Sequence, residues 1–313
     1  MIVTEYSFGL AKSSNKRRTV ALGFFDGMHL AHRELLASAV SIARRDGTVP
    51  AVFTFSAHSM GRKKRGGLIY STKDKLAIME QMGVEEVFVA DFTLLCPLSP
   101  EEFVSRVLID DLNCSVAVSG YNFRFGKGAQ AGHEELSTLM QARGGKTVVC
   151  DPVCIDGTPI SSSAIRSALS LGRVDIASKM LGEPYFINGV VSKGIGKGRG
   201  LGFPTVNTDL PDGCPLMRGV YRGVTHINGA RYNTVTNIGT CPTLGERAEH
   251  AETYIIDFDG DLYGQTLKIA LLGFVREEKQ FPTPEHLSRR IEEDMRVAIE
   301  ENGDDVWQEI GQN

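Results

Sequence analysis

The sequence is poor in cysteine, and the six cysteines among its 313 residues follow no metal-binding pattern. Cys150 and Cys154 are the closest pair, and neither a second pair nor a nearby histidine accompanies them. Zinc sites and disulfide frameworks depend on such repeated spacings. We therefore expect neither, and we interpret the cysteines as free thiols in a reducing compartment.

The sequence also lacks a strong excess of charge and long apolar segments. Its net charge of −4 gives no indication of binding to nucleic acid or to a membrane surface. No apolar run approaches the roughly 18–20 residues of a membrane-spanning helix, and the first residues lack the apolar core of a signal peptide. We expect a cytoplasmic protein that binds neither nucleic acid nor membrane. The oligomeric state is not predicted.

The length indicates about two domains. In the first part, short apolar segments alternate with helical patterns, and this alternation predicts a doubly wound, Rossmann-like parallel sheet covered on both faces. The expected strands are residues 19–22, 49–55, 86–90, 115–119 and 147–150. A helical stretch from residue 161 to 182 ends at Gly182-Glu183-Pro184, so we place the first domain at residues 1–182.

Beyond this point the expected strands follow one another without intervening helices. They are residues 185–191, 219–227, 231–238, 253–258 and 267–275. Turn signals such as Asn228-Gly229 separate them, which is typical of hairpins. We therefore predict a small antiparallel β-barrel at residues 183–313, with an amphipathic C-terminal helix over 284–301.

Two histidines, His29 and His32, follow a glycine-containing turn that directly succeeds the apolar run at residues 20–22. Gly23 and Gly27 permit a tight strand-to-helix turn. The i,i+3 spacing of the histidines places them on one side of the first helical turn, where unpaired N–H groups attract anions. H-x-x-H by itself favours two ordinary surface or capping histidines, but the preceding strand and glycine turn favour a cradle for a triphosphate.

A second glycine-rich segment, residues 195–207, is basic and is followed by no helical pattern. Thr205 and Asn207 are two residues apart, so in an extended chain their oxygens point to the same face. Such oxygens suit a Mg²⁺ ion that also binds nucleotide phosphates. The alternative interpretation of the segment is a flexible linker.

Taken together, these segments resemble the bacterial bifunctional riboflavin kinase/FMN adenylyltransferases, also called FAD synthetases. The resemblance extends from about residue 18 to about residue 300 and keeps the order of the family's motifs. These motifs are residues 23–29, 53–55, 100–103, 122–126, 160–166, 198–207, 219–221, 237–239 and 257–264.

For the first domain the resemblance implies an FMN adenylyltransferase, which joins FMN to the α-phosphate of ATP and releases pyrophosphate, giving FAD. His29, His32 and Arg166 would stabilise charge on the phosphates. The implied nucleotide-binding residues are Gly23, Phe24, Asp26, Gly27, Ser162 and Ser163, and the implied flavin-binding residues are Asn122 and Phe123.

For the second domain the resemblance implies a riboflavin kinase that transfers the γ-phosphate of ATP to riboflavin. Mg²⁺ would bind Thr205 and Asn207, and Glu252 would be the catalytic base. The implied nucleotide-binding residues also include Gly196, Lys197, Gly198, Arg199 and Gly202, and the implied flavin-binding residues are Tyr221, Asn237, Arg276 and Glu277.

The sequence departs from the family pattern in three places. Ala31 replaces a glycine before the second histidine, residues 56–59 read Ser-Ala-His-Ser in place of Asp-Pro-His-Pro, and Cys241 replaces an arginine. The departures at Ala31 and 56–59 leave open a flavokinase whose first domain only binds or regulates. A flavin sensor is a third possibility, but it would have no use for the base Glu252.

Overall fold

A computed structural model describes residues 1–9, 15–56, 67–192, 203–211, 213–240 and 249–302. The chain divides into two compact units. Unit 1 comprises Met1–Arg65 and Ser71–Ser161, and unit 2 comprises Gly66–Tyr70 and Ser162–Asn313. In the described ranges no helix is both long and apolar enough to cross a bilayer.

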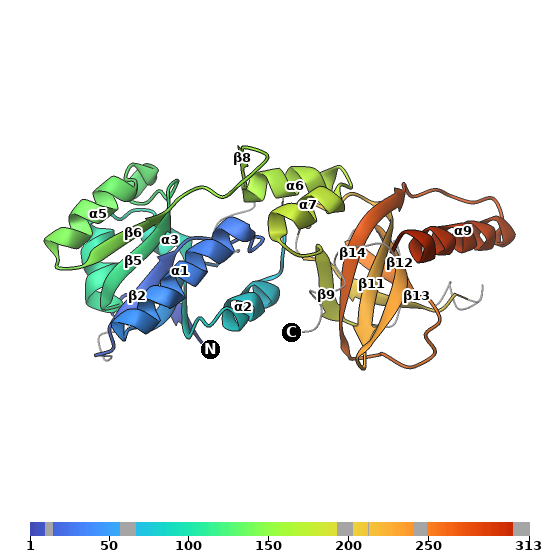
Figure 1. Ribbon diagram of the computed structural model, residues 1–313, viewed down its shortest axis with the longest axis horizontal. Coiled ribbons are helices and arrows are strands. Elements are labelled where there is room, and N and C mark those ends of the chain that lie inside the picture. Colours follow the sequence, from blue (N-terminus) through green and yellow to red (C-terminus); the bar gives the residue numbers. More distant parts are fainter. Residues whose placement is uncertain (10–14, 57–66, 193–202, 212, 241–248, 303–313) are drawn as a thin grey trace. The chain divides into compact units, whose positions relative to one another are not determined.

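Unit 1 contains a six-stranded sheet in the order β1-β4-β3-β2-β5-β6, and every neighbouring pair is parallel (Figure 1). The strands are β1 (Ile2–Tyr6), β2 (Arg18–Leu22), β3 (Val49–Phe55), β4 (Glu86–Ala90), β5 (Cys114–Gly120) and β6 (Lys146–Cys150). The doubly wound parallel sheet expected from the sequence is confirmed. Strand β1 was not expected, because we placed the first strand at residue 19; it adds to the free side of β4.

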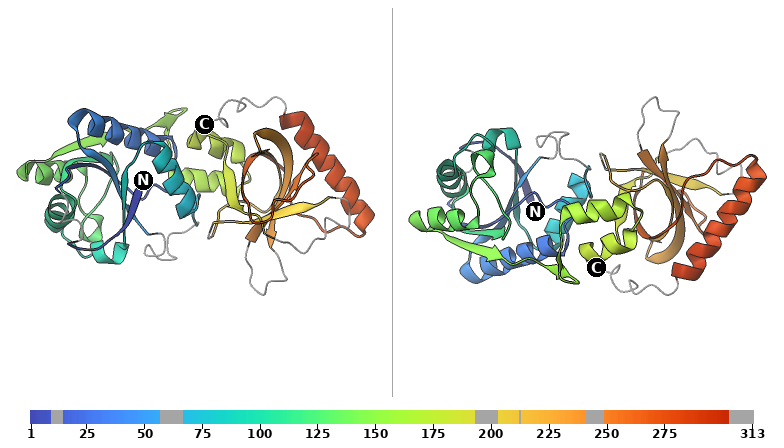
Figure 2. Two further views of the ribbon diagram at one scale, coloured as in Figure 1. Left: turned by 90° about the horizontal axis from the view of Figure 1, so that it is seen from below. Right: turned by 90° about the horizontal axis from the view of Figure 1, so that it is seen from above.

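Helices cover both faces of this sheet (Figure 2). They are α1 (Leu30–Asp46), α2 (Thr72–Gln81), α3 (Phe92–Leu95), α4 (Pro100–Glu102), the π-helix η1 (Phe103–Asp111), the 3₁₀ turn η2 (Lys127–Ala129) and α5 (His133–Ala142). Alternate side chains of β2 and β3, such as Val20 and Phe53, join the core under η1 and α5. The intervening ones, such as Ala21 and Val52, are fully buried on the opposite face. A short hairpin, β7 (Cys154–Ile155) and β8 (Thr158–Pro159), ends the unit.

Unit 2 is built on a second six-stranded sheet, in the order β10-β13-β12-β11-β14-β9, whose pairs are all antiparallel. The strands are β9 (Phe186–Val190), β10 (Thr205–Asp209), β11 (Gly219–Ile227), β12 (Ala230–Thr240), β13 (Glu249–Ile255) and β14 (Thr266–Arg276). The two end strands meet, since Ser192, just after β9, pairs with Asn207 of β10. The sheet therefore closes nearly into a barrel, as expected.

The hairpin between β11 and β12 shows why the sequence specifies this register. Ile227 pairs with Ala230, which leaves the two-residue loop Asn228-Gly229. Both loop residues have positive φ, 52° and 80°, and asparagine and glycine tolerate this conformation best. Helix α9 (Pro284–Asn302) then packs on β11 and β12.

The helical stretch expected at 161–182 forms two helices, α6 (Ser162–Ser170) and α7 (Val174–Leu181). Gly172, with φ of 72°, interrupts them. Both helices belong by their contacts to unit 2, where α7 packs on β14. The domain boundary that we expect at Gly182 stays a prediction.

Residues 67–70 also pack in unit 2, although the chain on either side of the 66–70 segment belongs to unit 1. The Tyr70 ring stacks on Phe186 with 4.4 Å between centroids, and on Tyr185 at 5.6 Å. The Tyr185 hydroxyl donates to the Ile69 carbonyl oxygen at 3.3 Å. The chain therefore enters unit 2 once before its main crossing after Ser161.

Candidate active sites

The histidine motif of unit 1 forms a strained strand-to-helix turn. Strand β2 is entirely buried. After it, Phe25 and Met28 adopt left-handed backbone conformations, with φ of 56° and 44°, and Gly27 has φ of 82°. A side chain at Gly23 would approach the Phe25 ring to 3.0 Å. Non-glycine residues with positive φ often mark functional sites, and here both lie inside the predicted phosphate cradle.

His29 caps helix α1, and His32 lies on the helix's first turn. The Nδ1 atom of His29 accepts a hydrogen bond of 3.4 Å from the backbone N–H of His32. The two imidazole rings stack, with 3.6 Å between centroids and 15° between planes. The Phe25 and His32 rings meet edge to face, with 5.3 Å between centroids. The turn thus brings the two histidines together, as the sequence predicted.

Both histidines are held neutral at physiological pH. Burial lowers the pKa of His29 to about 4. For His32, burial again lowers the pKa, and the charges of His29 and Lys75 add to the effect. The buried Nδ1 of His32 has no hydrogen-bond partner in the part of the chain that the structure describes. Neutral imidazoles at a helix N-terminus can donate hydrogen bonds to phosphate oxygens without an internal counterion.

Lys75 of helix α2 lies against this turn and was missed by the sequence analysis. It is 7% exposed, and its Nζ atom donates to the Phe24 carbonyl oxygen at 3.1 Å. Burial lowers the pKa of its ammonium to about 8, while the charge of the buried Asp26 acts in the opposite direction. The repeating pattern of α2 gave no signal, because lysine is common on exposed helix faces.

Asn122 and Phe123 follow β5, the strand beside β2. The chain order of the sheet reverses at this pair, and ligands of such sheets bind beyond the carboxyl ends of strands at the reversal. A Cβ atom at Gly120 would lie 3.4 Å from the Asn122 side chain and 4.0 Å from Leu35 of α1. The structure thus places these two flavin candidates on the loop next to the histidine turn, where Phe123 stacks on Phe125.

Ser162, Ser163 and Arg166, the other phosphate candidates, lie in α6 and therefore in unit 2. Ser162 and Ser163 are the first two residues of the helix, where backbone N–H groups are available to an anion. The Arg166 Nε donates to the Gly67 carbonyl oxygen at 3.0 Å. Their role in binding the triphosphate stays a prediction.

In unit 2 the register of three strands aligns the kinase candidates. Glu252 of β13 pairs with Asn207 of β10 on one side and with Asn237 of β12 on the other. The Thr205 hydroxyl donates to the Glu252 carboxylate at 2.7 Å. Thr205, Asn207 and Glu252 therefore share one face of the sheet. The Asn237 amide also donates to the Glu278 carboxylate at 3.2 Å.

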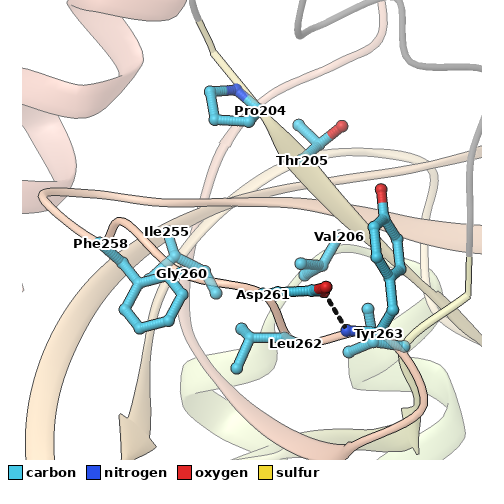
Figure 3. A pocket seen from close by; sticks show the side chains of 10 residues that line it. Pro204, Thr205, Val206, Ile255, Phe258, Gly260, Asp261, Leu262 and Tyr263 are labelled. Atoms are coloured by element: carbon cyan, nitrogen blue, oxygen red, sulfur yellow. Dashed lines mark hydrogen bonds between the residues drawn. The ribbon is translucent and has the colours of Figure 1, made fainter.

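An open pocket of about 190 Å³ adjoins Thr205 (Figure 3). Pro204, Thr205 and Val206 line it from β10 and its approach, and the loop between β13 and β14 contributes Phe258 and residues 260–263. The Asp261 carboxylate holds that loop by accepting a hydrogen bond of 2.9 Å from the Tyr263 N–H. The pocket is partly apolar, and Val206 and Ile255 line it from the strand face opposite the one that Thr205, Asn207 and Glu252 share.

Two flavin candidates have structural partners. The Arg276 guanidinium forms hydrogen bonds of 2.7–3.1 Å with Asp294 of α9, whose side chain is 1% exposed. Tyr221 is fully buried, and its hydroxyl donates to the Met217 carbonyl oxygen at 2.6 Å. Glu277 is exposed next to Arg276. Flavin contacts by these residues stay predictions.

The predicted glycine-rich loop lies outside the described residues. This applies to Gly196, Lys197, Gly198, Arg199 and Gly202, and also to residues 57–59 and Cys241. Ala31 is described: it is the second residue of α1 and has the right-handed backbone of that helix. Glycine is therefore not required at this position for conformational reasons.

Comparison with known proteins agrees with this two-site geometry. Residues 11–164 match the FAD synthetase family, and residues 181–301 match the riboflavin kinase family. The first match contains the histidine turn, and the second contains Thr205, Asn207 and Glu252.

Relatives with both parts are also found. The bifunctional riboflavin kinase/FMN adenylyltransferase of Bacillus subtilis is 36% identical over 299 residues, covering 93% of this chain and 94% of the relative. That of Listeria monocytogenes is 32% identical over 284 residues, covering 88% and 90%.

One solved structure, titled a macrolide-efflux protein from Streptococcus pneumoniae, has the same fold with a TM-score of 0.81 and 27% identity. The superposition covers 96% of this chain and 99% of that one. The long alignments to named relatives and the order of the two matched parts lead to one assignment. The chain belongs to the family of bifunctional riboflavin kinase/FMN adenylyltransferases.

Proposed function

We propose that this chain phosphorylates riboflavin to FMN with ATP in unit 2 and adenylylates FMN to FAD in unit 1. Both parts of the family are present, so both reactions are assigned to this chain. ATP, riboflavin, FMN and FAD are the substrates and products. The proposed location is the cytoplasm, where ATP and flavins are used together in metabolism.

The alignment of Glu252 with Asn207, together with the bond from Thr205, carries the kinase assignment. Glu252 accepts the proton of the terminal ribityl hydroxyl as that oxygen attacks the γ-phosphorus. A new O–P bond forms, the bond between the γ-phosphorus and the bridging oxygen breaks, and ADP leaves with that oxygen. The hydrogen bond from Thr205 keeps the carboxylate oriented before the substrate arrives.

Thr205 and Asn207 fit a Mg²⁺ ion by their chemistry, since a hydroxyl and an amide oxygen are hard ligands on one face of β10. Bound there with the nucleotide, the ion would neutralise phosphate charge. Thr205 and Asn207 would hold the ion, and Glu252 on the same face of the sheet would be the proton acceptor.

In unit 1 a phosphate oxygen of FMN attacks the α-phosphorus of ATP, and pyrophosphate leaves as the bond between the α- and β-phosphates breaks. No covalent enzyme intermediate is needed, so positioning and charge stabilisation provide the catalysis. Because His29 accepts at Nδ1, its neutral tautomer carries the proton on Nε2. His29 and His32 donate to phosphate oxygens from this turn.

One incubation tests both assignments. The purified protein is mixed with riboflavin, ATP and Mg²⁺, and the flavins are separated by chromatography over time. We expect FMN to appear first and FAD to follow. FMN without FAD would favour the flavokinase-only alternative, whereas no conversion of riboflavin would contradict the kinase assignment.

The right-handed backbone of Ala31 argues for two active units. Its methyl group adds no backbone strain, so the departure from glycine leaves the turn intact.

A further inference from the structure

The Phe24 carbonyl oxygen, near the start of the histidine turn, accepts hydrogen bonds from two side chains of other elements. The Thr54 hydroxyl at the end of β3 donates to it at 3.1 Å. The Lys75 Nζ from α2 donates to it at 3.1 Å and lies 3.4 Å from the same hydroxyl. Lys75 also lies over the Phe24 ring, 5.0 Å from its centroid. The turn is therefore fixed at one atom by two separate elements.

This contact is almost entirely removed from water. Thr54 is 0% exposed, Asp26 4% and Lys75 7%. Burying an ammonium group costs several kcal/mol even when it is paired. A surface lysine on α2 would avoid that cost, so folding alone does not explain a charge at this position. The charge is next to the two candidate phosphate-binding histidines, where the reaction brings several negative charges.

We propose that Lys75 is a positioning residue for adenylylation: it fixes the strained turn through the Phe24 carbonyl and supplies a buried positive charge behind His29 and His32. The turn holds left-handed Phe25 and Met28, and without an anchor it could relax to more common backbone conformations. Lys75 reaches the substrate only through the groups it holds. This inference rests on the proposed function of unit 1.

The charge has a second effect on the histidines. Besides burial, His29 and Lys75 are the groups whose charges lower the pKa of His32, and Asp26 is the group whose charge opposes burial at Lys75. Lys75 thus helps to keep His32 neutral until phosphate binds. Removing the cation should raise the pKa of His32, because the repulsion between Lys75 and an imidazolium at His32 is lost.

The test is Lys75→Met, which keeps an unbranched apolar side chain of nearly the same length and removes the charge and the donor. Lys73→Met is the matched control, since Lys73 is an exposed lysine on the same helix. We expect Lys75→Met to lower kcat for FAD formation by about 10²-fold, the scale of losing one preorganised group, with a smaller change in KM for FMN. Riboflavin phosphorylation in unit 2 of the same molecule and the Lys73→Met variant should both stay within twofold of wild type.

If Lys75 were purely structural, its replacement would not change the pH dependence of FAD formation. We expect the acid limb of FAD formation to shift to higher pH by about half a unit or more in Lys75→Met. NMR titration of the histidine ring protons should show the same direction for His32, and it needs no turnover. A wild type that makes no FAD would contradict the proposed function of unit 1, and the titration would still test the role of Lys75.

If Lys75→Met fails to fold, Lys75→Gln separates the anchoring of the Phe24 carbonyl from the supply of positive charge, because glutamine keeps a donor without the charge. FAD formation and a His32 titration equal to wild type in either folded variant would overturn the proposal. A loss in Lys73→Met as large as in Lys75→Met would overturn it as well.

Discussion

Glu252 is the residue whose replacement tests the kinase site most directly. Glu252→Gln keeps the shape and the bond from Thr205 but removes the proton acceptor, so FMN formation should fall by about 10²-fold or more while riboflavin binding persists. Turnover is measured by chromatography and binding by flavin fluorescence. Glu285→Gln, an exposed carboxylate on α9, is the control. Near-native turnover of Glu252→Gln would show that another group accepts the proton.

Thr205→Ala should weaken the binding of Mg²⁺ and leave the catalytic base Glu252 in place. Loss of one hard oxygen ligand is expected to raise the Mg²⁺ concentration needed for half-maximal FMN formation. A Mg²⁺ titration of the kinase rate measures this, and an unchanged midpoint would exclude Thr205 as a ligand.

Substitutions at the histidine pair should affect FAD formation selectively. His32→Ala should lower FAD formation by about 10²-fold or more, because a donor to the phosphates is lost, and should leave FMN formation unchanged. Ala31→Gly should leave the rate of FAD formation unchanged or raise it. If Ala31→Gly lost activity, the methyl group would have a function that the helix geometry does not indicate.

His29 also links stability to pH. Its folded pKa of about 4 lies below the usual 6.5, so the unfolded chain binds the proton more readily. The contribution of neutral His29 to the free energy of unfolding is therefore complete above about pH 6.5 and is lost as the pH falls toward 4. Between pH 7 and 5, unit 1 should lose about 2 kcal/mol more in wild type than in His29→Asn, which retains a helix-capping side chain. Denaturant unfolding at the two pH values would reveal the difference, and equal losses would mean that His29 is not buried in the neutral form.

At the scale of elements, helix α9 is attached to the barrel by charges. Asp294 binds Arg276 from β14 and lies 3.2 Å from Arg290 of its own helix. Asp294→Asn removes the charge from a buried pair, so unit 2 should lose about 3 kcal/mol or more of unfolding free energy. Glu293→Gln, which breaks only an exposed pair with Arg290, should change it by less than about 1 kcal/mol. Similar losses in the two variants would show that the burial of Asp294 does not matter.

The elements that could be predicted from the sequence are those with a strong local pattern. Strands β3, β4 and β11 were expected with their observed bounds, because apolar or β-branched runs end there at turn residues. Strand β1 escaped because it is short and largely exposed, and pairing with β4 defines it. The break between α6 and α7 depends on Gly172, which we interpreted as helical.

The candidate sites divide in the same way. His29 and His32 are neighbours in sequence, so their proximity was predictable from spacing. Glu252 lies 47 residues from Thr205, and only the register of β10 and β13 brings them together. No local pattern encodes that register. Lys75 was not predictable because its burial depends on packing against a turn about 50 residues earlier in the chain.

At the scale of the whole molecule, a fragment beginning at Gly182 should fold and phosphorylate riboflavin without the rest, since the barrel contains its own core and all three kinase candidates. It should melt at a lower temperature than a fragment from Ser162, because it lacks α7, which packs on β14. Thermal unfolding and FMN formation of the two fragments provide the measurement. An insoluble Gly182 fragment beside an active Ser162 fragment would move the domain boundary.

The packing of residues 67–70 in unit 2 has a consequence for biosynthesis. Ile69 leaves the ribosome 116 residues before its partner Tyr185. At about 5–20 residues per second, that interval is on the order of ten seconds. During that time the nascent chain contains most of the parallel sheet but nothing for Ile69 and Tyr70 to pack against. We therefore expect this apolar segment to stay accessible, for example to a chaperone, until Tyr185 and Phe186 at the start of the barrel have been made.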